Sequence, residues 1–92
     1  MPRQELVAEF ERRKVPTGVI KAGLGAYDYL TDNVRCPGGA AYPHEIAQAV
    51  FGIPTMGWNP SQPLTDIALE ILVEKGVLVK RDSDKRYRVA QV

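Results

Sequence analysis

The chain has 92 residues, 45% of them apolar, and a net charge of +1, which suits one globular domain with a modest core and excludes a wholly disordered chain. One cysteine and one histidine exclude an intramolecular disulfide and a Cys/His zinc cluster. No apolar run approaches the roughly 20 residues that span a bilayer, and the N-terminus has no signal-peptide pattern, so we expect a cytoplasmic protein with no membrane partner.

Two helices are predicted in the first third of the chain. Residues 3–14 contain strong helix formers, and the segment ends before Pro16, because the residue preceding a proline is steered out of the helical region. Apolar residues at helical spacing, the last of them Val34, predict a second helix over 17–34. Gly23 weakens this helix, and its expected use is the close approach of a neighbouring element.

The middle of the chain alternates loops and helices. Residues 35–42 are predicted to form a loop, because they contain the breaker Pro-Gly-Gly. A helix over 43–51 follows, with a proline at its first position. After a long connection that holds the only tryptophan, another helix is predicted over 62–75, with Gly76 as its stop.

The C-terminal residues predict a β-hairpin. An apolar strand over 77–79 leads into a charged tip at 80–86, and an alternating strand begins at residue 87. Residues 80–92 hold five basic and two acidic side chains, whereas residues 36–79 hold one basic and four acidic side chains. Positive charge is therefore concentrated on the hairpin.

The order of three helices and a hairpin over 17–92 resembles the winged helix-turn-helix superfamily. The resemblance is carried by ILVEKGVLVKR at 71–81, where a helix runs through a glycine into a strand, and by PHEIAQAVFGI at 43–53. It implies a mainly α fold with a small C-terminal β-hairpin, in a single domain over 1–92. Residues 1–16 would add an N-terminal helical extension to the core at 17–92.

The resemblance also implies a function. In that superfamily the helix before the hairpin enters the major groove of DNA, and the hairpin, or wing, contacts the backbone or the minor groove. We therefore expect a regulatory module that binds duplex DNA through phosphate contacts, with an affinity that depends on salt. The wing residues expected to bind DNA are all basic: Lys80, Arg81, Lys85, Arg86 and Arg88.

The last predicted helix also supports an alternative function, a protein–protein interaction or dimerisation module without DNA binding. Asp66, Glu70 and Glu74 recur every four residues and form an acidic stripe that would repel phosphates. Leu69 and Val73 lie beside the expected core face and need a cover, which the N-terminal helix, a second copy or another protein would supply. The expected core face comprises Leu64, Ile67, Ala68, Ile71 and Leu72. The expected interface residues are Trp58, Asp66, Leu69, Glu70 and Val73.

No catalytic constellation is visible in the sequence, and we expect neither an enzyme nor a metal or cofactor site. His44 and Glu45 are adjacent, so their side chains point apart on a helix. No motif places a His, Asn or Asp partner beside Cys36, which is expected to be a loop or half-buried thiol.

Overall fold

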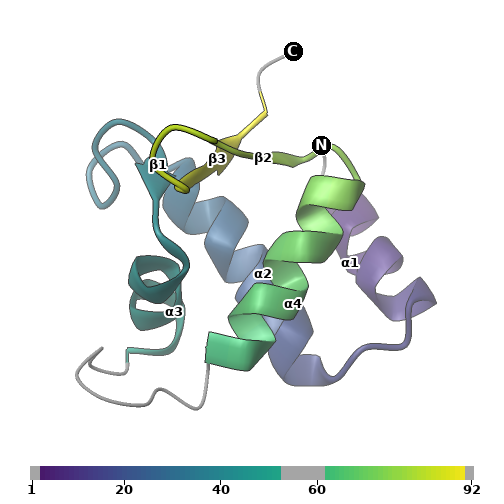
Figure 1. The fold of residues 1–92 in the computed structure, drawn as a ribbon. Coiled ribbons are helices and arrows are strands. Elements are labelled where there is room, and N and C mark those ends of the chain that lie inside the picture. Colours follow the sequence, from purple (N-terminus) through teal and green to yellow (C-terminus); the bar gives the residue numbers. More distant parts are fainter. Residues whose placement is uncertain (1–2, 53–61, 91–92) are drawn as a thin grey trace.

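The computed structural model describes residues 3–52 and 62–90 (Figure 1). Helices α2 and α4 cross at the centre, α1 and α3 flank them, and a small sheet lies across one end of the helices (Figure 1). The expectation of a mainly helical fold with a small β component is confirmed. The elements are α1 (Arg3–Arg12), α2 (Thr17–Leu30), β1 (Ala40–Ala41), α3 (Pro43–Phe51), α4 (Gln62–Glu74), β2 (Leu78–Lys80) and β3 (Tyr87–Val89).

The three strands form one antiparallel sheet in the order β1-β3-β2. Strand β3 is central, because Tyr87 pairs with Ala41 on one side and with Lys80 on the other. The prediction of a loop over residues 35–42 is therefore wrong near its C-terminal end, where two alanines form β1. Alanine has a low strand propensity, and these two residues form a strand because β3 offers them backbone hydrogen-bond partners.

Helix α1 packs against α2 through Leu6 and Phe10, which are both buried. The close approach depends on Gly23 of α2, since a Cβ built there would lie 2.2 Å from Phe10 Cζ. The prediction that Gly23 admits a neighbouring element is thus confirmed. Because Leu6 and Phe10 belong to the same hydrophobic cluster as the residues of α2 and α4, α1 contributes directly to the core.

Helix α2 ends at Leu30 rather than at residue 34. Asp32 closes the chain into a turn, because its Oδ1 accepts hydrogen bonds from the backbone N–H groups of Val34 (3.0 Å) and Arg35 (3.2 Å). Such local side-chain bonds compete with helical hydrogen bonds. Val34, the predicted last member of the apolar stripe, is consequently 88% exposed.

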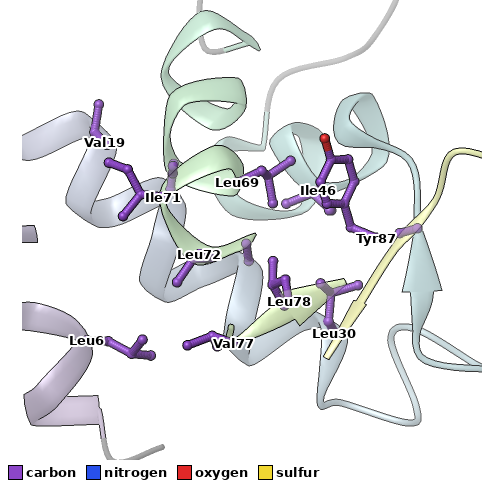
Figure 2. Packing of buried hydrophobic residues seen from close by; sticks show 14 of the residues in the cluster. Leu6, Val19, Leu30, Ile46, Leu69, Ile71, Leu72, Val77, Leu78 and Tyr87 are labelled. Atoms are coloured by element: carbon purple, nitrogen blue, oxygen red, sulfur yellow. The ribbon is translucent and has the colours of Figure 1, made fainter. Parts of the chain in front are cut away.

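The buried face of α4 also differs from the prediction. Leu69 is fully buried, whereas Ile67 is 44% exposed. Figure 2 shows Leu69 directed towards Ile46 of α3 and Tyr87 of β3. Helix α3 and the sheet therefore supply the cover that Leu69 was predicted to need. Its placement in a partner interface is wrong, because a side chain without exposed surface cannot contact a partner.

The C-terminal end of α4 follows the prediction. Gly76 adopts a positive φ of 83°, which glycine reaches without steric cost. The N–H of Val77 donates to the carbonyl of Leu72 at 2.9 Å, so the helix closes with the hydrogen bond typical of a glycine-terminated end. Val77 is itself buried, and this contact directs the chain straight into β2.

Candidate nucleic-acid interface

Asp84 organises the tip of the hairpin. Its carboxylate accepts hydrogen bonds from the Arg81 guanidinium, with an Arg81 Nε–Asp84 Oδ1 distance of 3.1 Å, and from the backbone N–H of Arg86 at 3.1 Å. The backbone turn is closed by two further bonds, from Arg81 N–H to the Arg86 carbonyl and from Lys85 N–H to the Arg81 carbonyl, each 2.8 Å long. The tip is therefore a defined turn held together by one acidic side chain.

The same carboxylate compensates part of the positive charge on the tip. The Arg81 guanidinium lowers the pKa of Asp84 from 3.8 to about 2, so Asp84 is ionised at neutral pH. Arg86 lies close by, with its Nε 4.0 Å from Asp84 Oδ2 and its guanidinium carbon 4.8 Å from the centre of the Tyr42 ring. Two of the five predicted DNA-binding side chains are thus engaged within the protein.

The other three cations, Lys80, Lys85 and Arg88, make no ion pair with any residue in the described ranges. Lys80 lies over the Tyr87 ring, 5.8 Å from its centre, on the side of the hairpin next to α4. Lys85 is exposed at the tip. Lys80 and Lys85 therefore have different surroundings on the hairpin.

Arg88 occupies a different environment from the other hairpin cations. It lines a hollow of about 350 Å³ at the side of the sheet, together with Leu30, Asn33, Gly38, Gly39 and Val89. Gly38 and Gly39 both have positive φ angles, and no atom lies within 4 Å of a Cβ built on Gly38. The hollow thus combines one guanidinium with an amide side chain and accessible backbone, groups that suit an anion.

The exposed face of α4 carries the acidic stripe. Asp66, Glu70 and Glu74 are exposed, as the sequence predicted. Two aliphatic side chains share this face, Ile67 at 44% and Val73 at 37% exposure. The fifth residue of the predicted partner interface, Trp58, lies outside the described residues.

A groove of about 410 Å³ separates this face of α4 from the hairpin. It is lined by Glu70, Val73, Glu74, Lys80 and Tyr87. Burial, followed by the negative charges of Asp66 and Glu70, raises the pKa of Tyr87, because each disfavours the phenolate. The groove therefore has an acidic wall on α4 and a basic wall on β2, with apolar surface between them.

An ion cluster around Glu9, which was not predicted from the sequence, joins α1 to the end of α4. Glu9 is buried to 7% exposure, accepts a hydrogen bond from Arg13 Nε at 2.8 Å, and pairs with Arg12. Lys75 Nζ lies 3.3 Å from Glu9 Oε1, and Arg13 also binds Glu74 at 2.8 Å. Only the pairs of Glu9 with Arg12 and Arg13 have a helical spacing that could have revealed them.

This cluster predicts a stability change in acid. Hydrogen bonds from Arg13, and next from Arg12, lower the pKa of Glu9 from 4.5 to about 2. A depressed carboxyl pKa contributes stability above pH 4.5, and that contribution is lost as the pH falls through about 2. We expect the free energy of unfolding, measured by urea titration, to fall less steeply from pH 4.5 to pH 2 in Glu9→Gln than in the wild type.

The matched control for Glu9→Gln is Glu5→Gln, because Glu5 is an exposed glutamate on the same helix and has no ion pair within the described residues. Glu5→Gln should follow the wild-type pH profile. A Glu9→Gln profile parallel to that of the wild type would show that the cluster does not stabilise the fold.

Two further side chains that can carry chemistry are Cys36 and His44. Cys36 is buried, with its Sγ 3.7 Å from the Ala40 carbonyl oxygen. His44 stacks on the Tyr42 ring at a centroid distance of 5.5 Å. Over residues 3–52 and 62–90, no group of three or more His, Cys, Asp or Glu side chains is placed to hold a metal ion. No helix in these two ranges has the length and apolar content needed to cross a membrane.

No family model, curated protein or solved structure matches this chain.

Proposed function

We propose that this chain is a winged-helix module that binds duplex DNA through its hairpin, with a regulatory rather than a catalytic role. The element order supports the proposal: a helix, a short strand, two helices and a hairpin, with β1 paired to β3. In a winged helix, α4 takes the position of the helix that faces DNA, and the β2–β3 hairpin is the wing. Because a fold by itself does not specify a function, the argument rests on the charges that these elements expose.

The acidic face of α4 argues against base readout by this helix. Asp66, Glu70 and Glu74 lie on its exposed face, and Glu70, which makes no ion pair within the described residues, would repel a phosphate placed against it, whereas Arg13 compensates part of the charge of Glu74. Groups that read base edges are mainly hydrogen-bond donors such as Arg, Lys, Asn and Gln. DNA binding would therefore be independent of sequence and would depend on the hairpin.

The observation that carries the proposal is the presence of hairpin cations free of internal carboxylate partners. Lys85 at the tip and Arg88 in the hollow beside Asn33 are the two that lie away from the acidic face of α4. The backbone of Gly38 and Gly39 lines the same hollow, so a phosphate at Arg88 would meet further polar groups. Arg81 and Arg86 contribute less, because both are engaged by Asp84.

The test is the salt dependence of binding to a random-sequence duplex, followed by fluorescence anisotropy. Each phosphate contact adds about 0.9 to the slope of log K against log salt, so Lys85→Ala with Arg88→Ala should lower that slope by about 2. Two unrelated duplexes should bind the wild type equally. The matched control is Lys14→Ala with Lys21→Ala, which removes the same charge from the helical end of the molecule.

Equal slopes for the hairpin and control variants would refute the hairpin contact. A wild type that does not bind at low salt would refute DNA binding altogether. The alternative function, protein interaction, concerns the exposed face of α4, which the DNA proposal leaves without a role.

A further inference from the structure

The groove between α4 and the hairpin has walls of opposite charge. Glu70 on α4 and Lys80 on β2 both line it, and neither makes an ion pair with another described residue. Glu74 also lines the groove on α4, where it is paired with Arg13, and Asp66 lies one helical turn before Glu70. The groove thus presents a negative patch, centred on Glu70, beside a positive one at Lys80.

The acidic side of this face also exposes aliphatic surface. Ile67 and Val73 are 44% and 37% exposed, and Val73 lines the groove. Removing such side chains from water favours association, and charged groups around them set the register and the choice of partner. Val73 thus supplies apolar surface within the groove, between the charged groups of its two walls.

The charge pattern distinguishes between possible occupants. Duplex DNA is uniformly negative, so it would match the wall containing Lys80 and be repelled by the wall containing Glu70. A uniformly basic segment would have the opposite mismatch. A second copy of this chain carries both charges, and rotation by 180° about an axis over the groove brings the positive patch of each copy onto the negative patch of the other.

We propose that this face forms a symmetric homodimer, in which Lys80 of each copy pairs with the partner's Glu70 and Val73 packs near the two-fold axis. The dimer goes beyond DNA binding and does not depend on it. It uses Lys80, whereas the proposed phosphate contacts use Lys85 and Arg88. Failure of either proposal therefore leaves the other intact.

The experiment is sedimentation velocity of the full chain in the absence of DNA, at low and high salt. The wild type is expected to dimerise at low salt and to dissociate as salt screens the Glu70–Lys80 pairs. Glu70→Lys and Lys80→Glu should each weaken dimerisation at least roughly ten-fold, because each substitution places like charges together at two symmetric positions. Circular dichroism of each variant verifies that it is folded.

The decisive measurement is a mixture of the two variants. In a heterodimer of Glu70→Lys with Lys80→Glu, one contact is the wild-type pair and the other is the same pair with its charges exchanged. Mixing should therefore restore dimerisation to near the wild-type level, and so should the double variant alone. A folding defect in one variant would not be rescued in this way.

Three results would overturn the proposal. One is a wild type that stays monomeric at every salt and protein concentration, which would leave the α4 face to a different partner. The second is that the Glu70→Lys and Lys80→Glu variants dimerise as strongly as the wild type. The third is a mixture of the two variants that associates no better than either variant alone.

Discussion

Replacing Leu69 with alanine is expected to lower the free energy of unfolding by about 2–5 kcal/mol, the range for deletion of a fully buried leucine side chain. Leu69 has no exposed surface and packs towards Ile46 and Tyr87 (Figure 2). A domain of this size has a total stability on the order of 5–10 kcal/mol, so the loss is a large fraction of the whole. Urea titration followed by circular dichroism measures it.

The matched comparison is Val73→Ala on the exposed face of the same helix. Val73 is 37% exposed, and we expect its truncation to cost less than about 1 kcal/mol. The difference between the two variants reports the orientation of α4. Equal losses for Leu69→Ala and Val73→Ala would contradict the packing of α3 and the sheet against the Leu69 side of the helix.

Replacing Phe10 with alanine is expected to have a similarly large effect, a loss of about 3–5 kcal/mol. Phe10 is fully buried, and its ring occupies the space that Gly23 of α2 leaves open. In a domain of this length 1 kcal/mol changes Tm by about 4–8 °C, so thermal unfolding should occur more than about 10 °C lower. Differential scanning calorimetry is the appropriate measurement.

The control for Phe10→Ala is Val7→Ala, because Val7 is a half-buried residue of the same helix. A much smaller loss is expected for Val7→Ala. If Phe10→Ala left Tm unchanged, α1 would be a dispensable extension rather than part of the core.

The local signals in the sequence predicted the parts of the fold that depend on neighbouring residues. The glycine stop at Gly76 and the proline at the start of α3 appear where their residue types placed them, and β2 begins one residue later than the strand predicted over 77–79. The misplaced end of α2 is also local, since Asp32 supplies the turn that ends the helix before Val34. Asp32 could be identified in the sequence as a residue that favours a turn. Its hydrogen bonds outweighed the tendency of the apolar spacing to continue the helix.

The candidate site was only partly predictable. The exposed carboxylates of α4 follow from helical spacing, and the five basic residues of the hairpin follow from composition. Which of those cations remain free depends on the conformation of the tip, where Asp84 binds Arg81 and lies beside Arg86. The separation of Lys80 from Arg88 depends on how the sheet sits against α4 and α2.

The sequence by itself determined the order of the helices and the hairpin, the glycine-terminated end of α4 and the acidic stripe, because each depends on residues within a few positions of one another. Only the tertiary structure decided that Ala40–Ala41 form a strand, that Leu69 rather than Ile67 is buried, and that Glu9 meets Lys75. These features depend on partners distant in sequence. Backbone pairing, burial and ion pairing between such partners exist only once the helices and the sheet have packed together.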